Sequence, residues 1–419
     1  MRRILLLSIA FPPDNLPSAA RPGQLFDYLP EYNYRPVVVA STLYGSLGGD
    51  ALVHRAPSAP ATATASAAAA LGRAFTRYCA PHEDRLSWVP HAVAAALRVI
   101  RSDPVDAIFS TSPSLAAHFA ALWLKSRVGL PWFADFQDPI QDNPGRARKW
   151  IYPYDALVER LLLGRADRLG ANTDTVAAIW RRRYPKWSEK ISILWNCFDP
   201  AEPVQPAPPP LRPYRVLAHV GSLYGGRHPG QLLASLERLR VDPSAYRVRL
   251  VGPIENDIMS EHGPLLERMR AARLLEFDNR QVPREEAARE TAQADYLVLL
   301  DLNELPTAFQ VPSKLMSYVR TGKPIIAWTQ KGSPVERILA RCGIRYVAVD
   351  PSSPAAECDR LVAEFLTIPT EPCRPSSWFR ETFDARSQAR QVAGLLDELL
   401  AGKTTTASRR TRRVGGSRT

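Results

Sequence analysis

Short apolar runs alternate with longer amphipathic segments along most of this 419-residue chain. In the first half, the apolar runs lie at residues 4–11, 37–41, 106–113, 131–138, 168–173 and 191–196. They lack polar alternation, which is typical of strands buried on both faces of a parallel sheet. Helical patterns lie between them, for example over residues 114–128 and 154–163. This order predicts right-handed βαβ units in a doubly wound α/β sheet.

A proline-rich segment interrupts the alternation at residues 199–215 (DPAEPVQPAPPPLRPYR), where seven of 17 residues are proline. Such a segment forms neither a helix nor a central strand, and it predicts a stiff, extended spacer. After it, apolar runs return at residues 214–223, 246–252, 274–279, 295–302, 324–329 and 345–350. Because the chain is also too long for one typical core, we predict two Rossmann-like domains.

The predicted boundaries follow from these patterns. We expect an N-terminal domain over 1–198, a linker over 199–213, a C-terminal domain over 214–383, a C-terminal helix over 384–402 and a basic disordered tail over 403–419. Ligands of doubly wound sheets bind at the carboxyl ends of the strands, so we expect the two domains to face a central cleft. The low-complexity stretch at 56–72 is expected to be a mobile insertion beside it, with a docking surface as the alternative.

The charge of the chain narrows the classes of partner. A formal net charge of +12 favours polyanions such as nucleic acid, anionic lipid or phosphorylated small molecules. Part of the excess lies in the terminal SRRTRRVGGSRT, and the densest internal cluster is WRRRYPKW at residues 180–187. The sequence contains no helix-turn-helix, finger or aromatic RNA-binding motif, so no nucleic acid is expected as a partner.

The cysteines and the N-terminus argue against a zinc site and a membrane span. The five cysteines form no CxxC pair, which predicts free thiols in a reducing cytosol. The N-terminal MRRILLLSIAFPPD resembles a signal peptide, but its short apolar run ends at two prolines without a small-residue cleavage site. We therefore expect a first buried strand there. No apolar stretch approaches the roughly 18 residues that a transmembrane helix needs, so we predict a cytoplasmic protein.

Two segments of the second domain carry candidate anion-binding chemistry. GSLYGGRHP at residues 221–229 follows the first strand of that domain. Its glycines let backbone N–H groups approach an anion, and Arg227 can form two parallel hydrogen bonds with a phosphate. Lys314, in the first turn of a predicted helix, is expected at the same edge of the sheet, and two converging cations suggest a diphosphate. The alternatives are an ordinary turn with an exposed arginine and a solvated helical lysine.

An ordered set of motifs resembles a known family. The chain is similar to the family-four, GT-B-fold glycosyltransferases in three motifs: ADYLVLLDLNE…VPSKLMSYVRTGKPIIA, GSLYGGR and SIAFPPD…AARPGQLFDYLPEYNYRPVVV. The match is strengthened by two further segments, SPSLAAHFAALWLKSRVGLPWFADFQDP and ISILWNCFD. The resemblance covers the chain up to about residue 400. It implies a GT-B architecture and hexosyl transfer from a nucleotide-diphosphate sugar to a glycan or lipid-linked acceptor. It also implies retention of anomeric configuration, and no metal or other cofactor.

The resemblance also implies roles for individual residues in binding the donor. Arg227 and Lys314 match the pair that holds the donor diphosphate and stabilises charge on the departing group. Gly221 matches the glycine that lets the backbone approach the donor, and Ser222 follows it. His118 matches a histidine near the sugar, so it joins Arg227 and Lys314 in the expected catalytic set. A structural histidine on a helix is the alternative.

The acceptor is expected on the first domain. Asp135 and Asp138, in DFQDP, fall in the region that faces the acceptor in the family, and so do Asn15 and Arg21 of the N-terminal loop. For the aspartates, the alternative is that one of them caps the next segment.

The chain departs from the family at two positions that matter for the donor. Many relatives carry two glutamates eight positions apart, and the second usually holds the donor ribose. The matching positions here are Phe309 and Ser317, and Glu304 lies five positions too early. Ser317 can donate one hydrogen bond to a ribose hydroxyl, which is weaker than the bonds a carboxylate accepts. The N-terminal loop also lacks the usual glycine pair.

The leading hypothesis is therefore a cytoplasmic, nucleotide-sugar-dependent glycosyltransferase of bacterial surface polysaccharide or glycolipid synthesis. The basic cluster at residues 180–187 mixes aromatic and cationic side chains, which favours peripheral contact with the anionic inner membrane, a solvated helix face being the alternative. A degenerate, non-catalytic GT-B scaffold, a nucleotide-sugar epimerase and a nucleic-acid binder remain as alternative functions.

Overall fold

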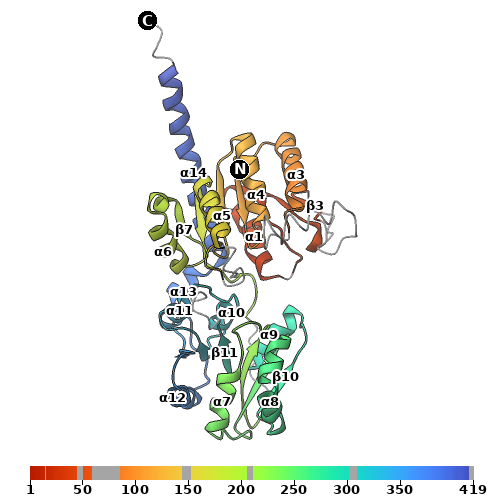
Figure 1. Ribbon diagram of the computed structural model, residues 1–419, viewed down its shortest axis with the longest axis vertical. Coiled ribbons are helices and arrows are strands. Elements are labelled where there is room, and N and C mark those ends of the chain that lie inside the picture. Colours follow the sequence, from red (N-terminus) through yellow and green to blue (C-terminus); the bar gives the residue numbers. More distant parts are fainter. Residues whose placement is uncertain are drawn as a thin grey trace. The chain divides into compact units, whose positions relative to one another are not determined.

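The computed structural model describes residues 1–14, 16–44, 51–58, 85–143, 152–204, 211–301 and 309–414. The chain divides into two compact units, which we call unit 1 (Met1–Asp199 with Ala385–Thr419) and unit 2 (Pro200–Asp384). Each unit is an α/β Rossmann-like fold around one parallel sheet (Figure 1). The predicted fold class of two doubly wound domains is confirmed, and the division falls at the proline-rich segment. Most of the predicted low-complexity insertion, and Asn15, lie outside the described residues.

The sheet of unit 1 has the strand order β3-β2-β1-β4-β5-β6-β7, and all neighbours are parallel. Its strands are β1 (Arg2–Leu7), β2 (Tyr34–Ser41), β3 (Val53–Ala56), β4 (Ala107–Thr111), β5 (Trp132–Phe136), β6 (Arg168–Ala171) and β7 (Ile191–Ile193). Each of the six predicted runs is a strand. The edge strand β3 was not predicted, because its sequence VHRA contains no apolar run.

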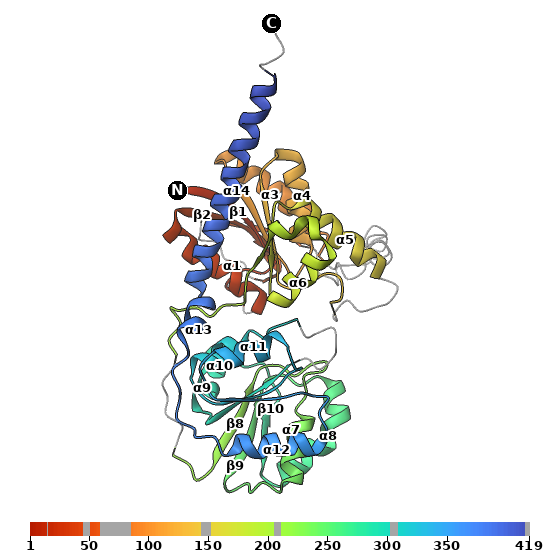
Figure 2. The same ribbon diagram turned by 90° about the vertical axis from the view of Figure 1, so that its left-hand side faces the viewer.

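The α-helices of unit 1 are α1 (Pro17–Tyr28), α3 (Trp88–Ser102), α4 (Ala116–Val128), α5 (Tyr152–Arg165), α6 (Asp174–Arg183) and α14 (Ala385–Val414). Helix α4 packs beside α3 and α5, whereas α1 packs along α14 (Figure 2). Ala389, Val392 and Leu396 of α14 are buried in the core with residues of β1 and β2. The C-terminal helix therefore completes the core of unit 1. It also continues to Val414, into the segment expected to be a disordered tail.

The sheet of unit 2 has the order β10-β9-β8-β11-β12-β13, again with parallel neighbours only. Its strands are β8 (Arg215–Val220), β9 (Tyr246–Val251), β10 (Leu275–Asp278), β11 (Tyr296–Leu300), β12 (Ile325–Trp328) and β13 (Tyr346–Val349). The helices are α7 (Gly230–Arg238), α8 (Asn256–Ala271), α9 (Arg284–Gln293), α10 (Lys314–Arg320), α11 (Pro334–Arg341), α12 (Ala355–Leu366) and α13 (Ser377–Thr382). Every residue of β11 and β12 is buried, as their uninterrupted apolar sequences predict.

Each sheet has one point at which the strand order reverses, between β1 and β4 in unit 1 and between β8 and β11 in unit 2. The connections that leave neighbouring strands there diverge to opposite faces, and such switch points are the usual ligand sites of doubly wound sheets. In unit 2 this point lies between the turn after β8, which contains Gly221, and the connection from β11 to Lys314 of α10.

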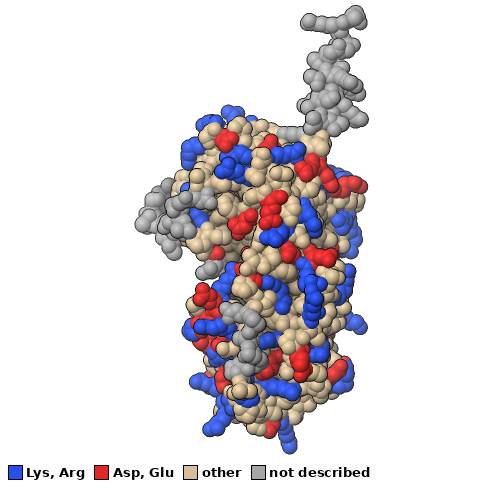
Figure 3. Space-filling model, turned by 180° about the vertical axis from the view of Figure 1, so that it is seen from behind, with Lys and Arg blue, Asp and Glu red and all other residues tan. Residues whose placement is uncertain are grey.

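Charged side chains are mixed on the surface. On the face shown in Figure 3, Lys and Arg lie among Asp and Glu rather than in a separate stripe. Ion pairs account for some of this mixing, for example Arg249 Nη2 with Glu290 Oε1 at 3.0 Å. Positive charge on that face is thus dispersed among negative charge.

Candidate functional site

Lys314 places its ammonium against the glycine turn after β8. A Cβ atom on residue 221 would lie 2.6 Å from Lys314 Nζ, so only glycine leaves room for the ammonium. Gly221 also has a φ of 126°, which side-chain-bearing residues rarely adopt. A Cβ on Gly252, in the turn after β9, would in turn lie 2.7 Å from the backbone of Gly221. The sequence-based prediction that Gly221 and Lys314 meet at one sheet edge agrees with this geometry.

His219, two residues before Gly221, holds the lysine in place. Its ring is buried in β8, with Nδ1 3.0 Å from the carbonyl oxygen of Val298 in β11 and Nε2 3.0 Å from Lys314 Nζ. Nδ1 therefore donates to the carbonyl, and unprotonated Nε2 accepts from the ammonium. Burial, followed by the charge of Lys314, holds the pKa of His219 well below its usual value, so the imidazole stays neutral.

The sequence analysis missed His219. The signal that was available is a polar residue in the apolar part of a strand (VLAHV), two positions before Gly221. Its two contacts are with residues of β11 and α10, which are 79 and 95 positions away in the sequence.

Arg227 is the second cation of this turn. It is largely buried, its Cζ lies 4.8 Å from the ring centroid of Tyr224, and Nη1 donates to the Tyr224 hydroxyl. Its Nε has no hydrogen-bond partner within the described part of the chain. Burial and then the charge of Arg227 lower the pKa of Lys314 to about 7. Among the described residues, no acid forms an ion pair with Lys314 or Arg227, which makes this edge of unit 2 suited to a ligand with two negative charges.

The remaining predicted donor residues lie close in sequence to this pair. Ser222 is half-buried in the same turn, and Ser317 is exposed one turn after Lys314. Phe309, at the other position where relatives carry a glutamate, is buried. Glu304 lies outside the described residues. A hydroxyl rather than a carboxylate is thus the group that α10 offers beside Lys314.

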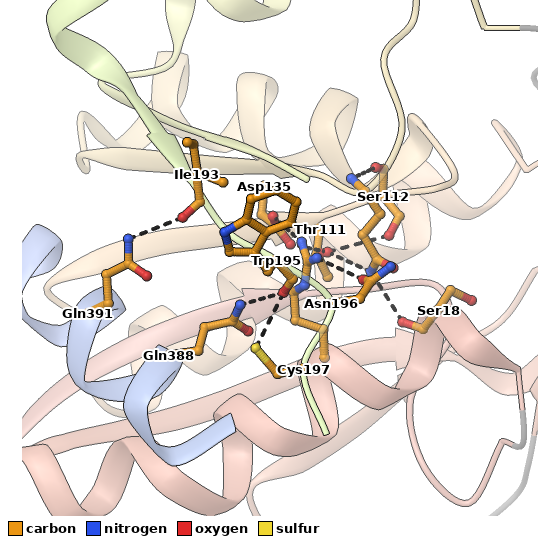
Figure 4. A network of polar contacts seen from close by, with 12 residues as sticks. Ser18, Thr111, Ser112, Asp135, Ile193, Trp195, Asn196, Cys197, Gln388 and Gln391 are labelled. Atoms are coloured by element: carbon orange, nitrogen blue, oxygen red, sulfur yellow. Dashed lines mark hydrogen bonds and ion pairs between the residues drawn. The ribbon is translucent and has the colours of Figure 1, made fainter. Parts of the chain in front are cut away.

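In unit 1, Arg21 and Asp135 form a buried ion pair at the carboxyl edge of the sheet. Arg21 Nη1 lies 2.6 Å from Asp135 Oδ1, and the side chains are 3% and 0% exposed. Asp135 Oδ2 accepts from the Thr111 hydroxyl at 2.7 Å, and Arg21 Nη2 donates to Asn196 Oδ1 at 2.9 Å (Figure 4). Burial raises the pKa of Asp135, whereas the charge of Arg21 opposes this shift. The pair braces the fold, and its lack of exposure does not support the acceptor contact expected for either residue.

The same network continues to the surface and to the C-terminal helix. Gln137 Nε2 lies 3.1 Å from Thr111 Oγ1 and 3.3 Å from the carbonyl oxygen of Ser18. From α14, Gln388 Nε2 donates to the carbonyl oxygen of Trp195 at 2.5 Å (Figure 4). Gln137 and the predicted acceptor residue Asp138 are both half-exposed. They are the polar side chains that this edge of unit 1 presents after β5.

His118 is enclosed by the core of unit 1, and its Nε2 has no hydrogen-bond partner among the described residues. It is fully buried in α4, with Nδ1 2.8 Å from Ser110 Oγ and its ring centroid 4.2 Å from that of Phe136. Ser110 Oγ also accepts from Trp132 Nε1 at 2.7 Å, so the Ser110 hydroxyl joins His118 to Trp132. Burial lowers the pKa of His118 to about 3. The contact with a sugar expected from the resemblance is not supported, and the alternative of a structural histidine fits this position.

Neither a metal site nor a membrane-spanning helix is found among the described residues. Among them, no group of three or more His, Cys, Asp and Glu side chains is arranged to hold a metal ion. In the same part of the chain, none of the helices combines the length and the apolar character that crossing a bilayer requires.

Comparison with known proteins agrees with the fold. Residues 24–202 match the family model described as Glycosyltransferase Family 4. No curated protein matches the sequence. Sucrose-phosphate synthase (tll1590) from Thermosynechococcus elongatus is similar with a TM-score of 0.61 and 12% identity, over 99% of this chain and 100% of that chain. Anabaena Alr3699/HepE, in complex with UDP and glucose, has a TM-score of 0.62 and 14% identity, over 95% and 100%. WaaG, a glycosyltransferase involved in lipopolysaccharide biosynthesis, has a TM-score of 0.56 and 14% identity, over 93% and 95%.

The fold of the chain is the GT-B fold of these glycosyltransferase structures. Within this class, the matched segment of unit 1 points to family four, which confirms the resemblance found in the sequence. The predicted type of enzyme, a nucleotide-sugar-dependent glycosyltransferase, agrees with these relatives.

Proposed function

We propose that the protein transfers a hexosyl group from a nucleotide-diphosphate sugar to a glycan or lipid-linked acceptor, with retention of anomeric configuration, in bacterial surface polysaccharide or glycolipid synthesis. The observation that carries this proposal is the pair of Lys314 and Arg227 beside Gly221, at the switch point of the unit 2 sheet. The complex of HepE with UDP and glucose supports the class of donor, and the pathway of WaaG supports the class of product. The proposed place of action is the cytoplasmic side of the inner membrane.

The chemical need of this reaction explains the two cations. When the bond between the anomeric carbon and the diphosphate breaks, its electron pair goes to the phosphate oxygen, so negative charge grows on the departing nucleoside diphosphate. Cations held in place before the reaction stabilise that charge without reorganisation. Lys314 is positioned by His219, and Arg227 by Tyr224. No metal ion is required in this proposal.

A second candidate function is nucleotide binding without transfer. It is favoured by Phe309 and Ser317, which replace the two carboxylates of many relatives. Purified protein mixed with a panel of nucleotide sugars separates the candidates, because slow donor hydrolysis or transfer marks the enzyme. Products formed without an acceptor reveal an epimerase.

Thermal shift with the same panel tests the site itself. The proposal expects one nucleotide sugar to stabilise the wild-type protein and to stabilise Arg227→Ala much less. Arg289→Ala, which removes an exposed arginine of α9, is the matched control and should respond like the wild type. Equal stabilisation of all three proteins would place the donor elsewhere.

We expect the affinity for UDP to fall as the pH rises above about 7. Lys314 has a pKa of about 7 in the free protein, and a bound diphosphate raises it. Binding above pH 7 therefore takes up a proton, and the affinity falls by up to about tenfold for each pH unit, until the pKa of the complex is reached. Below pH 7, the lysine is already charged and contributes no slope. Calorimetry from about pH 7 to pH 9 measures this, with Lys314→Arg as the permanently charged control. An unchanged slope in that variant would assign the proton to another group.

We expect His219→Leu to weaken UDP binding roughly three- to tenfold, because the net value of a hydrogen bond to a charged group is about 1.5–3 kcal/mol and part of it is recovered from water. Loss of the neutral acceptor also destabilises the ammonium, so the fall of affinity with pH should begin at a lower pH. His219→Gln, which retains an acceptor, should restore part of the affinity. A change in thermal stability without any change in the pH profile would show that His219 is only structural.

A further inference from the structure

The side chain of Gln137 lies at the switch point of the unit 1 sheet. Gln137 follows β5, and its Nε2 donates to Thr111 Oγ1 at 3.1 Å and to the carbonyl oxygen of Ser18 at 3.3 Å (Figure 4). Thr111 is the last residue of β4, and Ser18 belongs to the first turn of α1, which follows β1. The amide therefore bridges the ends of the two connections that diverge between β1 and β4, where ligands of doubly wound sheets usually bind.

The partners of Gln137 fix the orientation of its amide. A backbone carbonyl oxygen only accepts hydrogen bonds, so the NH2 group of the amide, and not its oxygen, faces Ser18. The Thr111 hydroxyl donates to Asp135 Oδ2 at 2.7 Å in preference to the carbonyl oxygen of Ser112 at 3.4 Å. Its oxygen is left to accept from Gln137. The hydrogen bonds thus run in one direction, from the amide through Thr111 to the buried ion pair described above.

The main chain of Gln137 is fixed as well. Its N–H donates to Ser112 Oγ at 2.8 Å, and Ser112 is buried. Among the described residues, nothing donates to Gln137 Oε1, and the side chain as a whole is half-buried. The backbone and the amide nitrogen are therefore both anchored, and the group that they leave available to a ligand is a neutral oxygen that accepts hydrogen bonds.

We propose that Gln137 determines acceptor specificity by accepting, at Oε1, a hydrogen bond from an uncharged hydroxyl of the acceptor sugar. This inference rests on the proposed transferase function and adds a substrate contact in unit 1. The chemistry of the oxygen selects the partner, because an ionised phosphate or carboxylate has no proton to donate. The cation of this network, Arg21, is buried and paired with Asp135, so it offers an anion no compensating attraction. Thr111 is a positioning residue, because it holds the amide while being buried itself.

Anchoring gives this contact its discrimination between ligands. A free glutamine side chain loses rotamer freedom when it binds, whereas the Gln137 amide is already restricted by its contacts with Thr111 and Ser18. A ligand that lacks the contacted hydroxyl covers Oε1 without giving it a donor. We therefore expect such an analogue to bind roughly three- to tenfold more weakly than the parent sugar.

Binding of simple glycosides to the full-length protein tests this assignment without turnover. Saturation-transfer-difference NMR titrations measure Kd for the methyl glycosides of glucose, galactose, mannose, rhamnose and N-acetylglucosamine, and then for the monodeoxy analogues of the tightest one. In the wild type, one deoxy analogue should bind roughly three- to tenfold more weakly than its parent. In Gln137→Met, which retains the length of the side chain without the amide, parent and analogue should bind equally. Gln281→Met, at an exposed glutamine between β10 and α9, is the matched control and should retain the wild-type difference.

Thr111→Val tests the positioning role. The substitution keeps the shape of the side chain but removes the oxygen that accepts from Gln137 Nε2, so the difference between parent and deoxy analogue should shrink. Thr111→Ser, which retains the hydroxyl, should keep most of the difference. Parent and analogue are compared within each variant, so a change in the stability of unit 1 cannot by itself produce this pattern.

Three results would overturn the proposal. They are the absence of glycoside binding by the wild type, an undiminished preference for the parent sugar in Gln137→Met, and a raised KM for the nucleotide sugar in slow donor hydrolysis by that variant. The last would place the contact on the donor sugar. Calorimetry with UDP reports the donor site of unit 2 separately. A protein that does not bind UDP but keeps the Gln137-dependent preference would refute the transferase function and leave this sugar contact standing.

Discussion

Lys314→Ala is expected to lower kcat/KM for sugar transfer by about 10²–10³-fold, the range seen when one preorganised group that stabilises a developing negative charge is removed. Lys314 Nζ lies against Gly221, is held by His219, and shares the site with Arg227. Steady-state kinetics with the nucleotide sugar found by the thermal-shift panel measure the effect.

Lys331→Ala is the matched control for this prediction. Lys331 is an exposed lysine of the same unit, in the connection between β12 and α11, and its removal should leave kcat/KM unchanged. Removal of Lys314 should not lower the thermal stability of the ligand-free protein, because burial and Arg227 already disfavour its charged form. Full activity in Lys314→Ala would contradict the proposal that Lys314 and Arg227 bind the donor diphosphate.

Asp135→Ala is expected to destabilise unit 1 by about 3–5 kcal/mol, the cost of removing one partner from a buried ion pair. The substitution leaves the guanidinium of Arg21 buried at 3% exposure with only Asn196 as a partner among the contacts described above. It also removes the acceptor of the Thr111 hydroxyl. Chemical denaturation, followed by a probe placed in unit 1, measures the change in free energy of unfolding.

The double variant Arg21→Met/Asp135→Leu should recover most of the lost stability, because replacing both charges by apolar groups removes the buried, unpaired cation. Glu237→Ala, which breaks an exposed ion pair with Arg268, should have little effect. If Asp135→Ala were as stable as the wild type but lost acceptor binding, Asp135 would be the acceptor residue that the sequence resemblance suggested, and the structural role described here would be wrong.

The fold was largely predictable because parallel, doubly covered strands require continuous apolar sequence. Twelve predicted runs correspond to twelve strands, and the errors in their ends are at most four residues. The exception, β3, lies at the edge of its sheet, where two of its four residues are polar or charged and the apolar pattern disappears. The assignment of α14 to unit 1 was not predictable, since its partners in α1 and in β1 and β2 lie at the opposite end of the chain.

The sites were predictable to different extents. Gly221, Arg227 and Lys314 were found because a glycine turn and a lysine at a helix start are local patterns at the carboxyl ends of strands. His118, Arg21 and Asp135 look equally suited to chemistry in the sequence, but the structure buries all three. Burial depends on which helix face meets the sheet and on partners such as Asn196, 175 positions from Arg21.

The sequence by itself determined the two α/β units and their boundary and indicated the cations of the proposed donor site, because apolar runs, prolines and glycine turns act over short distances along the chain. Only the tertiary structure decided that His219 holds Lys314, that Asp135 pairs with Arg21, and that Thr111 and Ser18 fix the Gln137 amide. Each of these depends on side chains from separate elements meeting in space. Their proximity is set by strand order and helix packing, which no local pattern records.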